Sequence, residues 1–194
     1  MNRFKLAIAL VASLFLFGCK DQPSPSAAPA AAPAAAVSIP AIEAEARGIT
    51  VGSTMSARTV FVFFDPQCPH CAALWQAAKP LKSQAKFVWI PVRLLNNTSL
   101  TQGAALLAAK DPVAAMDEHE TAILANQKGD VTGGGEAQKE SVTKNTALFT
   151  RFGFASVPSI VALHAQSGAL VTREGALATP ELAKLLGLQP PAGN

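Results

Sequence analysis

A strand pattern that runs directly into a pair of cysteines at the start of a helix pattern constrains the fold most. Residues 59–64 form a continuous β-branched and aromatic run, which is typical of a strand buried on both faces. Residues 65–67 end this run, and Cys-Pro-His-Cys at 68–71 opens an amphipathic helix pattern. A second strand pattern follows at 86–92. Strand, helix and strand in this order predict a βαβ unit with a right-handed crossover.

The two cysteines stand where thiol–disulfide chemistry is favoured. Cys68 is expected at the helix start, where unpaired backbone N–H groups and the helix dipole stabilise a thiolate. Pro69 presets the first turn, and His70 places a donor beside the sulfur. Cys71 lies one turn further in, where it is shielded and can resolve a mixed disulfide. We therefore predict Cys68 as the nucleophile, Cys71 as the resolving thiol, and Pro69 and His70 as residues that tune the redox pair.

The cysteine pair has two other interpretations. Half of a zinc site is the first, but the sequence has no second Cys-x-x-Cys, and His119 and His164 have no ligand spacing to the pair. A purely structural disulfide is the second. It is disfavoured because so short a loop gives strain and little entropic stabilisation. We expect redox chemistry with no metal and no other cofactor.

The rest of the chain predicts one α/β domain with a helical insert. Residues 101–127 indicate two short helices, with Asp111 capping the second. A loop is expected at 129–135 and a helix at 136–152. Two strands joined by a hairpin follow at 158–163 and 169–173, and a final helix begins at 179. Trp75 and Trp89 are expected in the core, whereas His119 falls in a charged run expected to face solvent.

The N-terminus predicts export and lipid attachment. The apolar stretch at 6–17 follows two basic residues and is too short to cross a bilayer core of about 30 Å, as in a signal peptide. The segment that ends in Gly18-Cys19 resembles a bacterial lipobox, which implies removal of residues 1–18 and acylation of Cys19. An ordinary signal peptide cleaved elsewhere is the alternative. Lys20, after the cysteine, favours the outer membrane by the same resemblance.

Residues 19–41 are rich in Ala, Pro and Ser and are expected to form a linker, which leaves 42–194 as the folded domain. The net charge of the whole chain is +3, and two of the positive charges, Arg3 and Lys5, lie in the signal segment. The remaining charge is too small to predict a nucleic-acid partner.

Three segments carry a resemblance to a known family: residues 62–71 with Trp75, residues 108–112 and residues 156–160. They resemble the catalytic domain of periplasmic DsbG/DsbC-type thiol:disulfide interchange proteins. The resemblance implies a thioredoxin fold, an α/β structure with a central mixed sheet and flanking helices, and a helical insert at about 99–152. It also implies that Pro158 is a cis-proline facing the redox pair and that Val157 offers its backbone to an extended substrate.

Two features depart from that family. Two dipeptides, Pro69-His70 and Val157-Pro158, are similar to those of the oxidase DsbA. Pro69-His70, between the cysteines, favours a more oxidising redox pair. The stretch between the linker and the first core strand is also too short for the dimerisation domain of the isomerases. We therefore expect a monomer.

These observations predict a periplasm-facing thiol–disulfide oxidoreductase, lipid-anchored to the inner leaflet of the outer membrane. It would reduce or isomerise disulfides in cysteine-containing envelope proteins, or reduce sulfenylated cysteines, with a DsbD-like electron donor implied by the resemblance. A DsbA-like oxidase served by a DsbB-like acceptor is the first alternative. A non-catalytic binding or metal-binding lipoprotein is the second.

Overall fold

The computed structural model describes residues 34–191. The predicted signal peptide, Cys19 and residues 19–33 of the predicted linker lie outside the described residues. Helix α1 (Ile39–Glu45) begins inside the predicted linker, so the folded part starts before residue 42. The side chain of Ser38 caps this helix by accepting a hydrogen bond from the Ala41 N–H, and Pro40 occupies its first turn. Within residues 34–191, no helix has the length and apolar character needed to span a membrane.

A mixed five-stranded sheet forms the centre of the described residues. Its strands are β1 (Ile49–Gly52), β2 (Thr59–Phe64), β3 (Lys86–Pro91), β4 (Ser159–Leu163) and β5 (Leu170–Glu174), in the spatial order β1-β3-β2-β4-β5. β2 pairs with β3 in parallel, and the other neighbours are antiparallel. The predicted mixed sheet and parallel βαβ unit are therefore confirmed.

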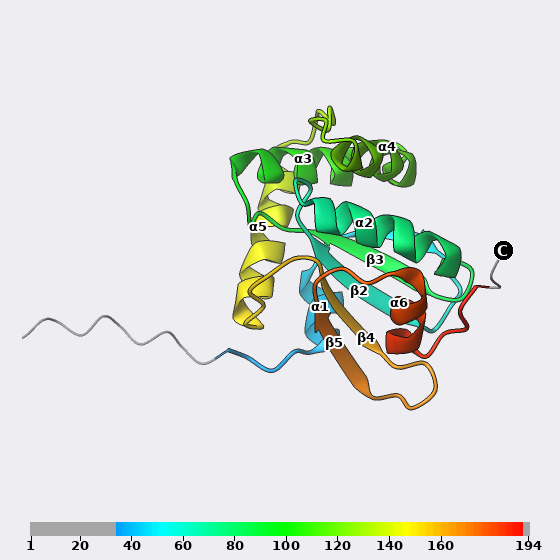
Figure 1. Ribbon diagram of the computed structural model, residues 1–194. Coiled ribbons are helices and arrows are strands. Elements are labelled where there is room, and N and C mark those ends of the chain that lie inside the picture. The colour runs from blue at the N-terminus through cyan, green and yellow to red at the C-terminus, as the bar shows by residue number, and fades with distance from the viewer. Residues whose placement is uncertain (1–33, 192–194) are drawn as a thin grey trace, which may run out of the picture. The chain divides into compact units, whose positions relative to one another are not determined.

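Helices cover the sheet. They are α2 (Pro69–Ala78), the 3₁₀ turn η1 (Lys79–Leu81), α3 (Asn97–Ala108), α4 (Pro112–Leu124), α5 (Glu136–Arg151) and α6 (Thr179–Leu186). α2 packs against α6 and α4, while α5 packs against α1 and α3 (Figure 1). The predicted cap Asp111 accepts a hydrogen bond from the Ala114 N–H at 3.0 Å. The helical insert therefore brings α4 against the helix that carries the cysteines.

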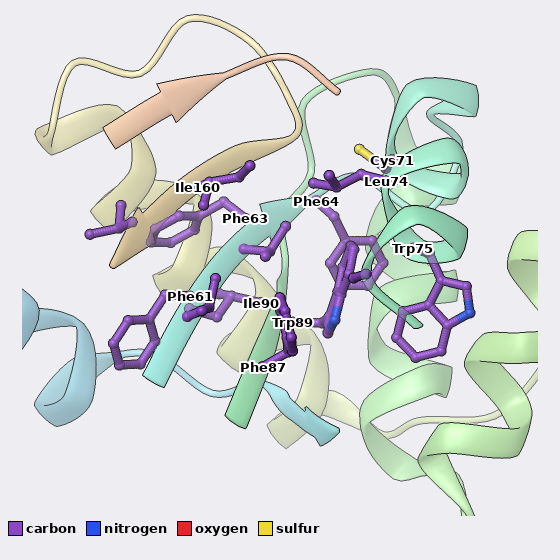
Figure 2. Close-up of a cluster of buried hydrophobic side chains, with 14 of the residues drawn as sticks. Phe61, Phe63, Phe64, Cys71, Leu74, Trp75, Phe87, Trp89, Ile90 and Ile160 are labelled. Carbon is purple, nitrogen blue, oxygen red and sulfur yellow. The ribbon is translucent and has the colours of Figure 1, made fainter. Parts of the chain in front are cut away.

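The core is aromatic and lies directly below the cysteine pair. The Trp75 and Trp89 rings meet edge to face with centroids 5.0 Å apart, and both side chains are buried, as predicted. Phe64 packs edge to face on Trp89 at 5.8 Å. Figure 2 shows Cys71 at the end of this cluster, beside Leu74. The first turn of α2 is thus held on a close-packed apolar base.

One sequence expectation about the insert is wrong. His119 was expected on a solvent-facing charged surface, but it is 2% exposed and its neighbour Glu120 is fully buried. Glu118, between Asp117 and His119, is exposed. The charge run alone could not reveal this, because the packing of α4 against α2 turns one side of the run inward.

Candidate active site

Cys68 occupies the N-cap of α2, where the chain leaves β2 and enters the helix. Its backbone is extended, with φ −96° and ψ 112°, and its carbonyl accepts hydrogen bonds from the N–H groups of Cys71 and Ala72 at 2.9 and 3.2 Å. Its own N–H donates to the Asp65 carbonyl at 3.0 Å. The Cys68 Sγ lies 3.7 Å from the Val157 carbonyl oxygen. Cys68 and Cys71 are both free thiols in this structure.

The environment of Cys68 favours its thiolate. Hydrogen bonding from the Cys71 thiol is the main cause that lowers the pKa of Cys68 from 9.0 to about 6, against the opposing effect of burial. The backbone N–H groups of Cys71 and His70 and the charge of His70 act in the same direction. Pro69 and His70 themselves are exposed beside the sulfur. The tuning role of Pro69 and His70 stays a prediction.

Cys71 differs from Cys68 mainly in ionisation, since both side chains are buried and Cys68 is only 6% exposed. Cys71 is fully buried, and desolvation raises its pKa well above 9.0, with further contributions from its hydrogen bond to Cys68 and the charge there. The thiolate is the attacking form of a cysteine. The two thiols are therefore asymmetric: the surroundings of Cys68 favour its thiolate, and those of Cys71 favour the thiol.

The loop before β4 faces the redox pair. The Val157–Pro158 peptide bond is cis, and the 3.7 Å approach of Val157 to Cys68 brings the two predicted regions together. Glu174 on β5 fixes this loop: its Oε2 accepts hydrogen bonds from the N–H groups of Ala155 and Ser156 at 2.9 and 2.7 Å. Sequence reasoning missed Glu174, because only the pairing of β5 with β4 brings it to the loop.

Asp65 organises the turn that leads into Cys68. This carboxylate is fully buried and accepts four hydrogen bonds. Its Oδ1 is bonded by the Gln67 N–H at 2.8 Å and the Ser99 hydroxyl at 2.7 Å, and its Oδ2 by the N–H groups of Leu94 and Leu95 at 2.8 and 2.9 Å. One side chain thus links the active-site turn to the start of α3. The same hydrogen bonds explain why β2 ends before Asp65, as predicted.

We expect Asp65→Asn to destabilise the protein by about 2–3 kcal/mol, because the amide nitrogen cannot accept the hydrogen bonds that one carboxylate oxygen receives. Urea unfolding of the reduced protein measures this change. Asp111→Asn is the matched control, since Asp111 is exposed and its amide can still cap α4. Equal stability of Asp65→Asn and the parent would contradict the role given to Asp65.

α4 holds the same turn from the other side. His119 Nε2 donates to the Pro66 carbonyl at 2.7 Å, and burial lowers the pKa of His119, which favours its neutral form. Gln102 bridges the turn and the insert: its Oε1 accepts from the Gln67 amide at 3.0 Å, and its Nε2 donates to the Gly129 carbonyl at 2.7 Å. The insert therefore acts as a rigid support for the cysteine turn. Across residues 34–191, no group of three or more His, Cys, Asp or Glu side chains is arranged to hold a metal ion.

This fold and its dithiol at a strand–helix junction define a thioredoxin-like protein. A family model described as a thioredoxin-like domain matches residues 50–189, and the chain belongs to this family. Its sequence is 33% identical to the thiol:disulfide interchange protein DsbG of Pseudomonas aeruginosa over 141 residues, which are 72% of this chain and 55% of that protein. The Escherichia coli K12 DsbG is 36% identical over 63 residues, 31% of this chain and 25% of that protein. The chain thus covers little more than half of the length of the Pseudomonas protein and a quarter of the length of the Escherichia coli protein.

Solved structures of low sequence identity share the fold. Proteus mirabilis ScsC in a compact conformation superposes with a TM-score of 0.59 at 14% identity, over 72% of this chain and 71% of that one. A periplasmic thioredoxin-like protein from Salmonella enterica serovar Typhimurium also gives 0.59, at 16% identity over 72% of this chain and 88% of that one. The predicted thioredoxin fold and the resemblance to the DsbG group are confirmed.

Proposed function

We propose that this protein is a thiol–disulfide oxidoreductase that reduces or isomerises disulfides in other proteins, or reduces sulfenylated cysteines, through Cys68 and Cys71. One observation carries the proposal: a thiol with a pKa of about 6 at a helix N-cap stands beside a buried thiol with a raised pKa. A metal ligand set or a structural disulfide does not require this asymmetry, whereas exchange chemistry does. Homology to DsbG supports the same activity.

In the proposed cycle, the Cys68 thiolate attacks one sulfur of a substrate disulfide, and Cys71 then displaces the substrate from Cys68. The Val157 carbonyl, close to the Cys68 sulfur, would pair with an extended substrate segment and align its cysteine. The first experiment is reduction of insulin disulfides by the protein with dithiothreitol as electron source. Catalysis above the rate with dithiothreitol alone is expected, and its absence would overturn the proposal.

A DsbA-like oxidase is a second candidate, favoured by one specific observation. Pro69 and His70 stand between the cysteines, as the resemblance to DsbA has it, and the lowered pKa of Cys68 stabilises its thiolate, which makes the disulfide form more oxidising. The reduction potential separates the candidates: near −270 mV, as in thioredoxin, supports a reductase, and near −120 mV, as in DsbA, supports an oxidase. The resting redox state of the pair in cells should agree with the measured potential. A reductase or isomerase is expected to be mostly reduced, and an oxidase mostly oxidised.

We also propose the cellular setting that the sequence predicts. The protein would be attached to a membrane by acylation of Cys19 and would face the periplasm, with cysteine-containing envelope proteins as substrates. A membrane redox partner of the DsbD type would keep the pair reduced, or one of the DsbB type would keep it oxidised. Metabolic labelling with a fatty acid, in the parent and in Cys19→Ala, tests the attachment.

A further inference from the structure

Glu120 on α4 is a buried acid that no part of the fold explains. Its side chain is fully buried, and neither of its carboxyl oxygens has a hydrogen-bond partner among the described residues. A buried polar group without partners costs stability, and such groups are rare in native proteins. Asp65, the other buried acid of this region, accepts four hydrogen bonds and is thereby accounted for.

The packing of α4 on α2 places Glu120 beside Cys71. Two contacts fix the direction of α4: the Trp75 Nε1 donates to Asp117 at 2.7 Å, and His119 donates to the Pro66 carbonyl at 2.7 Å. α4 therefore runs antiparallel to α2, and its later residues lie nearer the cysteine turn. Glu120 lies one turn after Asp117, and Cys71 lies one turn before Trp75, as Figure 2 shows for the two residues of α2.

Charge effects agree with this placement. Burial is the main cause that raises the pKa of Glu120 well above 4.5, and the negative charges of Cys68 and Asp65 raise it further. Glu120 in turn raises the pKa of Cys71. The titratable groups around Glu120 are thus Cys68 and Cys71 from α2, Asp65 from the preceding turn, and His119 from its own helix, which favours the neutral state.

We propose that Glu120 is the proton acceptor for Cys71 when the mixed disulfide is resolved, so that the helical insert supplies the acid–base group of the redox pair. The proposal rests on the function proposed above. Cys71 must lose its proton to attack, yet it is fully buried. The carboxyl of Glu120 lies near it, without a hydrogen bond to it, and has no other task in the fold.

The Cys68 thiolate attacks one substrate sulfur, the substrate S–S bond breaks, and the other substrate sulfur leaves as a thiolate. After this step Glu120 releases its proton, which that thiolate takes up through solvent. Loss of the charge on Cys68 favours this release, because that charge disfavours the carboxylate. Cys71 then passes its proton to Glu120 through one water molecule, since the two groups are not hydrogen-bonded in the dithiol form, and attacks the Cys68 sulfur. The Cys68–Cys71 bond forms, the remaining substrate sulfur leaves as a thiolate, and two electrons have passed from the pair to the substrate.

The test is a single-turnover reaction of the reduced full chain with glutathione disulfide, acid-quenched and followed by mass spectrometry of the Cys68–glutathione adduct. In Glu120→Gln, we expect the adduct to form at a rate within about twofold of the parent. Its decay at pH 7 should be slower by about a hundredfold or more, the range of general-base effects. The difference should shrink at high pH, where hydroxide can remove the Cys71 proton.

Glu118→Gln is the matched control, since it makes the same change at an exposed position of the same helix and should behave as the parent does. Decay of the adduct at the parental rate in Glu120→Gln would overturn the role of Glu120. Failure of the parent itself to form an adduct at Cys68 would instead overturn the proposed function.

Infrared difference spectra of Cys71→Ser, taken at pH 7 between its free form and its Cys68–glutathione mixed disulfide, give a second readout that needs no change at Glu120. We expect a protonated-carboxyl band in the free form that weakens in the mixed disulfide, the state in which the cycle leaves Glu120 ionised, and the same change when Glu118→Gln is added. An identical carboxyl band in both forms would overturn the proposal.

Discussion

A Cys71→Ser variant is expected to accumulate mixed disulfides with its substrates and to lose turnover on the order of a hundredfold or more. The Cys68 thiolate can still attack in this variant, but no second thiol can displace the captured substrate. Serine retains nearly the size of cysteine, so the aromatic core around position 71 should be preserved. Non-reducing gels of cells expressing the variant, with identification of the captured proteins by mass spectrometry, measure the effect.

Cys68→Ser is the matched control for this experiment. It removes the attacking sulfur, so it should lose turnover to the same degree and capture nothing. Equal capture by the two variants would show that Cys71 is accessible enough to attack by itself, and would contradict the assignment of roles to the pair. The trapped proteins from Cys71→Ser also identify the natural substrates.

The second large effect is the pH dependence of the dithiol form. The pKa of Cys68 is about 6 in the folded protein against an ordinary 9.0, so between these pH values the unfolded chain binds the extra proton. The free energy of unfolding therefore rises with pH in this window, by at most about 4 kcal/mol, and the gain is lost as the pH falls through 6. The alkylation rate of Cys68 with iodoacetamide should have its midpoint near pH 6.

Other groups also affect the pH profile of stability, and a variant separates them. The raised pKa of Glu120 gives a slope of opposite sign above pH 4.5, and the raised pKa of Cys71 does so above pH 9. We therefore expect the difference in unfolding free energy between the parent and Cys68→Ala, both reduced, to grow from pH 6 to pH 9. A difference that is independent of pH would contradict the thiolate assignment.

Much of the fold could be predicted from the sequence because the signals are local. The β-branched and aromatic run predicts strand 59–64 with its observed bounds, and Cys68 is the N-cap of α2, at the expected helix start. Asp111 caps α4, and Gly153, with φ 76°, follows the end of α5. Each of these features depends on residues within a few positions of one another.

The candidate site was predicted only in part. The Cys68–Cys71 pair and the Val157–Pro158 segment were found because short motifs mark them. The supporting residues Glu174 and Asp65 have no such motif: their roles depend on donors contributed by the loop before β4 and by the start of α3. No pattern in the sequence states which distant N–H groups a carboxylate will meet.

The sequence by itself determined the chemistry that we propose for this protein, because two cysteines one helical turn apart after a buried strand already favour a thiolate and a resolving thiol. The tertiary structure decided how that chemistry is supported. Only the packing of the insert against α2 turned His119 and Glu120 inward, away from the solvent where the charge run had placed them. The physical reason is that helix-start electrostatics act within one turn, whereas burial of a charge depends on which helix packs over it.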